Sequence, residues 1–135
     1  MTAQSDLDPE TETLAAAFIA GIEQGNISRL YELCSKDVVI WHNTDNQEVD
    51  LDNVARILSW LSTNVRELRY SEVRRRAFAG GYIQQHVLTG IAPGGDNLHL
   101  PACLVVHVSD GKVARIEEYV DSAGAEVLRK RPGQR

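Results

Sequence analysis

The spacing of the apolar residues changes once along this chain, near residue 65, and that change limits the folds open to it. Before this point Leu14, Phe18 and Ile22 recur every four residues, the repeat of a helix with one buried stripe. From Leu68 onward apolar and polar residues alternate, which is typical of strands. Helices followed by successive strands predict an α+β protein with a meandering antiparallel sheet.

Capping and turn residues set the expected boundaries. Helices are expected over residues 9–24, 28–34 and 52–64, and strands over 38–42, 68–78, 82–89, 98–108 and 113–121. Asp8 and Asp52 are the predicted N-caps, and the glycines at 80–81 and 111 mark tight hairpins. We expect three helices packed on the concave face of a curved sheet, which together form a cone with a mostly apolar pocket.

Length and charge exclude several classes of protein. A chain of 135 residues predicts one domain, here residues 9–128, between flexible segments at 1–8 and 129–135. The formal charge of -5 argues against a nucleic-acid partner. With neither a membrane-spanning run nor an export leader in the sequence, we expect no membrane partner and a cytoplasmic location. Cys34 and Cys103 are expected to be reduced thiols.

Residue patterns that mark metal and phosphate sites do not occur. The histidines lack metal-ligand spacing; they are His42, His86, His99 and His107. The paired glycines at 80–81 and 94–95 lie in hairpin positions and do not precede a helix, so no phosphate-binding loop is predicted. We therefore expect no metal and no cofactor.

Five segments, in order along the chain, carry a family resemblance. They are Gly25-Asn26, Leu30-Tyr31-Glu32-Leu33, Asp37-Val38-Val39-Ile40-Trp41-His42-Asn43, Ser109-Asp110-Gly111-Lys112-Val113 and Glu118-Tyr119-Val120-Asp121. Together they resemble the nuclear transport factor two-like superfamily, and more narrowly its SnoaL-like polyketide cyclases, ketosteroid isomerases and limonene epoxide hydrolases. The resemblance covers roughly residues 10–125 and implies the same cone-shaped fold, a cystatin-like α+β barrel with three helices on the concave face of a curved antiparallel sheet.

The ketosteroid isomerases use an aspartate base on the first strand, a protonated aspartate that binds the oxyanion, and a tyrosine on a helix. The resemblance places Asn43 at or beside the base position, with His42 as the alternative, because one extra residue precedes Trp41. The oxyanion position falls on Leu104, and the first helix offers Phe18. Since Asn43 cannot ionise and Leu104 cannot donate a hydrogen bond, isomerisation by that machinery is not expected.

The epoxide-hydrolase pattern fits better. Its Tyr-x-Asn, Arg-x-Asp and Asp-Tyr motifs match Trp41-x-Asn43, Gln84-x-His86 and Glu118-Tyr119. This implies Glu118 as general base, His86 as general acid and Asn43 as an orienting group. Gln84 stands where the family has a cation, which argues against direct epoxide opening. The alternative is that His86 is a hydrogen-bonded sheet histidine and Glu118 a rim carboxylate.

These observations predict a small-molecule-binding protein that acts by cofactor-free acid–base chemistry on an apolar, oxygenated substrate, as an isomerase, cyclase, dehydratase or hydrolase. The side chains expected to bind the substrate are Trp41, Gln84, Phe18, Leu104 and Tyr82. The alternatives are a non-catalytic ligand-binding module and a dimerising interaction module. Both faces of the strand at 98–108 are largely apolar, so we expect a homodimer through the outer face of the sheet.

Overall fold

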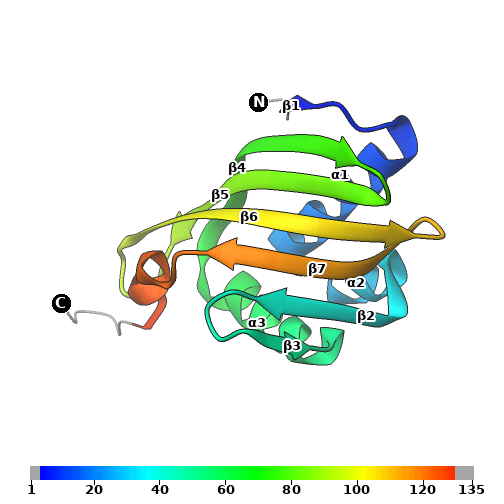
Figure 1. The fold of residues 1–135 in the computed structure, drawn as a ribbon. Coiled ribbons are helices and arrows are strands. Elements are labelled where there is room, and N and C mark those ends of the chain that lie inside the picture. Colours follow the sequence, from blue (N-terminus) through cyan, green and yellow to red (C-terminus); the bar gives the residue numbers. More distant parts are fainter. Residues whose placement is uncertain (1–3, 130–135) are drawn as a thin grey trace.

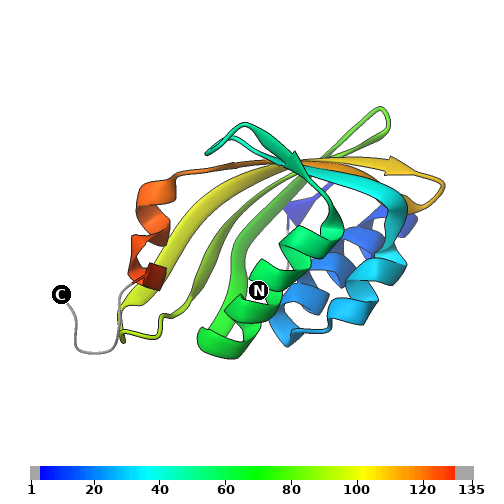
Figure 2. The same cartoon turned by 90° about the horizontal axis from the view of Figure 1, so that it is seen from below.

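The computed structural model describes residues 4–129. Its elements are β1 (Gln4–Ser5), α1 (Pro9–Gln24), α2 (Ile27–Leu33), β2 (Cys34–His42), β3 (Gln47–Val49), α3 (Leu51–Asn64), β4 (Arg66–Phe78), β5 (Gly81–Ile91), β6 (Asn97–Ser109), β7 (Lys112–Val120) and the 3-10 helix η1 (Ser122–Arg129). The α-helices lie on one side of a single curved sheet, and η1 follows β7 at one end of it (Figures 1 and 2). The predicted α+β class and the one-sided helical layer are confirmed.

The sheet has seven strands in the order β1-β4-β5-β6-β7-β2-β3. Its centre, from β4 to β7, is the predicted antiparallel meander. At the edges, β2 pairs with β7 and β1 pairs with β4 in parallel, so the sheet is mixed and does not close into a barrel. This corrects the expectation of a wholly antiparallel sheet. The reason is that β2 and β7 are far apart in the chain, with β3, α3 and three strands between them. No hairpin connects the two strands, so their pairing is not required to be antiparallel.

Side-chain caps determine where the helices begin. The Asp8 carboxylate accepts a backbone hydrogen bond in the first turn of α1, as predicted, and Gly25 ends that helix in the left-handed region at φ 68°. At α3 the cap is Asp50, whose carboxylate accepts a backbone hydrogen bond in the first turn. Asp52, predicted as this cap, lies in the first turn instead, where its charge favours the positive end of the helix dipole.

Two irregularities bend β4 around the helices. Its register with β5 shifts between residues 66 and 69 and again between 71 and 74. Glu67 and Glu72, one in each irregularity, both adopt φ 54°. Extra residues of this kind bend a strand and increase its twist. The sheet therefore curves over the side that carries the helices (Figure 2), and the cavity lies on this concave face.

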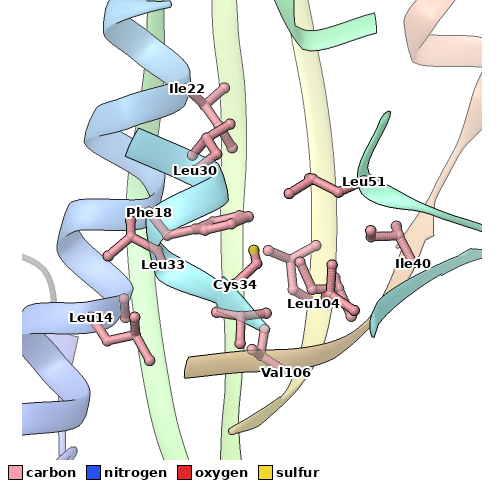
Figure 3. Close-up of a cluster of buried hydrophobic side chains, with 14 of the residues drawn as sticks. Leu14, Phe18, Ile22, Leu30, Leu33, Cys34, Ile40, Leu51, Leu104 and Val106 are labelled. Atoms are coloured by element: carbon pink, nitrogen blue, oxygen red, sulfur yellow. The ribbon is translucent and has the colours of Figure 1, made fainter. Parts of the chain in front are cut away.

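The packed core lies between α1, α2 and the concave face of the sheet (Figure 3). Phe18 projects from α1 and is 5% exposed; its surroundings include Leu30, Leu33, Cys34, Leu104 and Val106. Burial of a side chain of this size contributes about 1.5–3 kcal/mol. Cys34 and Cys103 are both free, and burial raises the pKa of the Cys34 thiol to about 11, which makes it unreactive.

Three elements, β1, β3 and η1, were not predicted. β1 lies within the segment expected to be flexible, 1–8, and pairs with β4 at Arg74 and Arg75. η1 packs against β6 so closely that a Cβ on Gly124 would meet Leu100 Cδ1 at 2.9 Å. Of the predicted flexible tail, residues 130–135 lie outside the described residues. Within the described part of the chain, the helices are too short or too polar to cross a membrane.

Candidate functional site

A cavity of about 470 Å³ lies between α1, α3, η1 and the concave face of the sheet. Its apolar wall consists of Phe18, Ile22, Ile40, Leu51, Val54, Ile57, Leu58, Trp60, Leu61, Leu88, Leu100, Leu104, Ile116 and Leu128. Four polar side chains complete the wall, namely His42, Tyr70, Glu118 and Arg129. A cavity of this size and lining suits a small apolar ligand held by a few polar contacts.

One cross-strand row of residues arranges the polar groups of the concave face. Strand register places His42 beside Glu118, Glu118 beside Leu104, Leu104 beside Gln84, and Gln84 beside Arg75. Side chains of one such row project from the same face of a sheet. Leu104 therefore separates two polar groups, an acid–base pair on β2 and β7 and a cluster on β4 and β5.

The first group is the pair formed by His42 and Glu118. The two side chains are 25% and 29% exposed, and His42 Nε2 lies 3.0 Å from Glu118 Oε1. The hydrogen bond to Glu118 raises the pKa of His42, and this effect outweighs burial, which lowers it. The imidazole therefore keeps its proton to a higher pH than a free histidine does, and the pair places a hydrogen-bond donor beside a carboxyl group inside one cavity.

The second group is buried and joins α1 to the sheet. Arg75 Nε donates to Gln84 Oε1 at 2.9 Å, and its guanidinium also forms an ion pair with Glu12. The Gln84 amide nitrogen lies 3.0 Å from His86 Nδ1. Arg75 is 2% exposed and Gln84 is fully buried. Burial lowers the pKa of His86 to about 4 against the opposing influence of Glu118, so this imidazole is neutral at pH 7.

The structure places His86 and Glu118 on one face but does not pair them. The carboxylate of Glu118 bonds His42, and Nδ1 of His86 contacts Gln84. The β5 residue that stands level with Glu118 is Gln84, and His86 lies two positions further along the strand. The charge of Glu118 nevertheless raises the pKa of His86 in part, so the two groups lie within electrostatic range.

Trp41 and Asn43 lie on the opposite face of the sheet from the cavity. Both flank His42, and successive strand residues point to opposite faces. Asn43 Oδ1 accepts a hydrogen bond from the Val120 backbone at 2.9 Å, and Trp41 stacks edge-on against Tyr119 with ring centroids 5.2 Å apart. These contacts join β2 to β7. Neither side chain lines the cavity that was expected to contain them.

The remaining predicted binding residues divide into two pairs. Phe18 and Leu104 line the cavity. Tyr82 and Gln84 face the same side of the sheet but are 1% and 0% exposed, outside the cavity wall. They lie nearer the packed end of the cone, where α1 and α2 cover the sheet.

Sequence reasoning missed or left open several cavity residues. His42 was the alternative to Asn43, and the structure places His42 inside. Tyr70 was not singled out, although its alternation with Leu68 carried the signal. Ile57 of α3 lines the cavity and is 59% exposed. Among residues 4–129, no three His, Cys, Asp or Glu side chains gather closely enough to hold a metal ion.

Comparison with known proteins places this arrangement in a family. The SnoaL-like domain matches residues 15–116, which is most of the chain. Among curated proteins, none matches the sequence.

Solved structures share the fold at low sequence identity. AclR of Streptomyces galilaeus, a candidate hydroxylase, aligns with a TM-score of 0.77 at 18% identity and covers 91% of this chain and 98% of its own. A candidate polyketide cyclase from Pseudomonas putida KT2440 gives 0.71 at 21% identity, with coverages of 88% and 96%. An LEH-like epoxide hydrolase of M. tuberculosis gives 0.66 at 17% identity, with coverages of 89% and 90%. At these identities the similarity shows the fold, and the chemistry has to be argued from the residues.

Proposed function

This chain belongs to the SnoaL-like domain family, and on that premise we propose that it is an enzyme that performs acid–base chemistry, without a cofactor, on a small apolar substrate that carries oxygen. The single observation that carries this proposal is the His42–Glu118 pair in the wall of an otherwise apolar cavity. A carboxylate and an imidazolium side by side supply a proton acceptor and a proton donor near neutral pH.

Each member of the pair has a defined role in this proposal. Glu118 is the general base, which takes a proton from a water molecule or from a carbon atom next to a carbonyl group. His42, whose pKa is raised by Glu118, is the general acid that returns a proton to the substrate. His86 and Asn43 have no catalytic role here, because His86 is buried and neutral and Asn43 faces the other side of the sheet.

The lining supports the substrate class. Fourteen apolar side chains surround the four polar ones. Transfer of an apolar molecule from water into the cavity is therefore favourable, whereas a charged molecule would lose its hydration there. The few polar groups then orient any oxygen that the molecule carries.

The test measures two reactions that require a base. These are deuterium exchange at the α-carbons of 2-tetralone, followed by NMR, and hydrolysis of styrene oxide, followed by chromatography. We expect the wild type to accelerate at least one of them, and Glu118→Gln and His42→Gln each to reduce that rate by about 10²-fold or more. Glu117→Gln is the matched control, because Glu117 is the neighbouring carboxylate and bonds Arg115 outside the cavity. An unchanged rate in Glu118→Gln would contradict the proposal.

A second function, ligand binding without turnover, is favoured by one observation. Glu118 and His42 already form a hydrogen bond with each other, and a pair with a purely structural role would do the same. In that case the wild type converts neither substrate, but it still binds an apolar ketone such as 2-acetylnaphthalene.

We also propose that the protein forms a homodimer through the convex face of the sheet. The outward residues of β6 include Pro101, Cys103 and Val105, and Tyr119 beside Cys103 is 47% exposed. A hollow of about 1160 Å³ also crosses this face. Sedimentation at micromolar concentration should give a dimer that Tyr119→Glu dissociates and that Tyr31→Gln, on the helical side, leaves intact. A monomeric wild type would show that this face is not the interface.

A further inference from the structure

Tyr70 is a polar group of the cavity wall that the proposed acid–base pair does not use. It lies on β4, just before the second irregularity of that strand. Its backbone N–H donates to Glu23 Oε2 of α1 at 2.7 Å. Its ring stands edge-on to the His86 ring, with centroids 4.6 Å apart and an interplanar angle of 61°. Both the backbone and the ring of Tyr70 are therefore held in place.

The hydroxyl of Tyr70 makes no hydrogen bond to any of residues 4–129. A tyrosine hydroxyl inside a protein usually has a partner, because an unsatisfied polar group is costly to bury. Here the side chain lines the cavity, so a bound ligand can supply that partner. Burial, and then the charge of Glu118, raises the pKa of Tyr70 well above its ordinary value, so the phenol stays protonated and is a donor.

The buried cluster of Arg75 and Gln84 determines the tautomer of the His86 ring, which contacts the Tyr70 ring. Because Gln84 Oε1 accepts from Arg75, the amide nitrogen of Gln84 must be the group that faces His86 Nδ1. Nδ1 of a neutral His86 is then an acceptor, and the ring proton is on Nε2. The hydrogen bond through Nδ1 fixes the orientation of the His86 ring. Because the Tyr70 ring packs edge-on against it, the position of the Tyr70 ring is restricted as well.

Tyr70 and Glu118 approach the cavity from different strands. The strand order β4-β5-β6-β7 separates their backbones by three steps across the sheet, about 14 Å at roughly 4.8 Å per step. They are also offset along the strands by four residues, because Tyr70 is level with Leu100 of β6 and Glu118 with Leu104. Both side chains project into the concave side and shorten this gap. A ligand between them can therefore meet the carboxylate at one end and the phenol at the other.

We propose that Tyr70 is a ligand-binding residue whose hydroxyl donates a hydrogen bond to the carbonyl oxygen of an apolar ketone in the cavity, and that His86 is the positioning residue for Tyr70. The inference rests on the proposed function in one respect, that this cavity is the ligand site. It adds the neutral carbonyl oxygen as the feature recognised.

The test compares two ligands of nearly equal shape, 2-acetylnaphthalene and 2-isopropenylnaphthalene, in which a CH₂ group replaces the carbonyl oxygen. For the ketone, Tyr70→Phe should weaken binding about 3- to 10-fold, the usual effect of one hydrogen bond. For the hydrocarbon the affinity should not change. Tyr82→Phe is the matched control, since it removes a hydroxyl from the same face of the sheet outside the cavity wall and should alter neither affinity.

Infrared spectroscopy of the bound ketone provides an independent readout. In the wild type the C=O stretching frequency should lie below its value in an apolar solvent, and in Tyr70→Phe it should return to that value. His86→Leu should broaden this band and weaken ketone binding 2- to 3-fold by loosening Tyr70. His86→Phe, which keeps a ring against Tyr70, should restore most of the effect, whereas a merely structural role for His86 would leave the band unmoved.

The outcomes separate this inference from the proposed function. If both ligands bind and Tyr70→Phe changes neither the ketone affinity nor the band, the role of Tyr70 is overturned and the acid–base proposal stands. If the wild type binds neither ligand, the cavity is not a site for apolar molecules, and both proposals are overturned.

Discussion

The two polar groups on the concave face contain the same kinds of residue in different surroundings. His42 and Glu118 are each about a quarter exposed and line the cavity, whereas Arg75, Gln84 and His86 are buried. Only Leu104 separates them in the cross-strand row. The pKa of His42 is raised by its carboxylate partner, while that of His86 is lowered by burial.

This difference shows that the residue type alone does not assign a catalytic role. His86 was the predicted acid, yet burial lowers its pKa by more than the charge of Glu118 raises it, and the nearby Arg75 lowers it further. His42 has a carboxylate at 3.0 Å and access to the cavity, and it can therefore exchange a proton with a ligand. The buried cluster supports the fold and orients its neighbours, and the exposed pair is available for chemistry.

The largest expected effect comes from breaking the buried cluster at Arg75. Arg75→Met leaves the Gln84 oxygen and the Glu12 carboxylate without their donor, and we expect a loss of about 3 kcal/mol in the free energy of unfolding. Urea denaturation measures it. Arg74→Met is the matched control, because Arg74 is exposed and should change stability by less than about 0.5 kcal/mol. Equal effects from both variants would show that the cluster is not the stabilising group.

The next effect is the pH dependence contributed by His86. Its pKa is about 4 in the folded state and 6.5 when unperturbed, so the unfolded state binds the proton first as the pH falls. The stabilisation is complete above pH 6.5 and is lost between 6.5 and 4, with a full range of about 3 kcal/mol.

The contribution of His86 is measured as the free energy of unfolding of the wild type and of His86→Phe at a series of pH values between 7 and 4.5. We expect the difference between the two proteins to shrink as the pH falls, because the variant has no proton to bind at this position. Parallel stability curves would contradict the idea of a neutral, buried His86.

The smallest effect concerns the exposed pair and has the opposite sign. The raised pKa of His42 stabilises the folded state below pH 6.5, and this contribution is lost as the pH rises through the folded value. Solvent limits it to under about 1 kcal/mol. In an NMR titration of the imidazole protons, Glu118→Gln should lower the pKa of His42, and Glu117→Gln should not. If both variants shift it equally, the pairing with Glu118 is not its cause.

Local patterns predicted much of the fold and part of the site. The four-residue spacing and the Asp8 cap located α1, and alternation located β4 to β7 and the inward position of Glu118. The helix, its cap and the strands depend on neighbours within a few residues of one another, which a sequence displays directly. Phe18 and Leu104, which line the cavity, were named from the family resemblance instead.

The inward face of β2 could not be determined in this way. Val38 and Ile40 are apolar on one face, and Val39 and Trp41 are apolar on the other, so burial alone favours neither orientation. The choice depends on the parallel pairing of β2 with β7, a strand some eighty residues away, and on an irregularity in that pairing between Cys34 and Val39.

The sequence by itself thus determined the order of the elements, their caps and the alternation within each strand, because these arise from short-range hydrogen bonding and side-chain spacing. The tertiary structure decided that His42, and not Asn43 or His86, meets Glu118. The physical reason is that alternation defines two faces of a strand, and only long-range pairing and the burial of the whole core select which face lines the cavity.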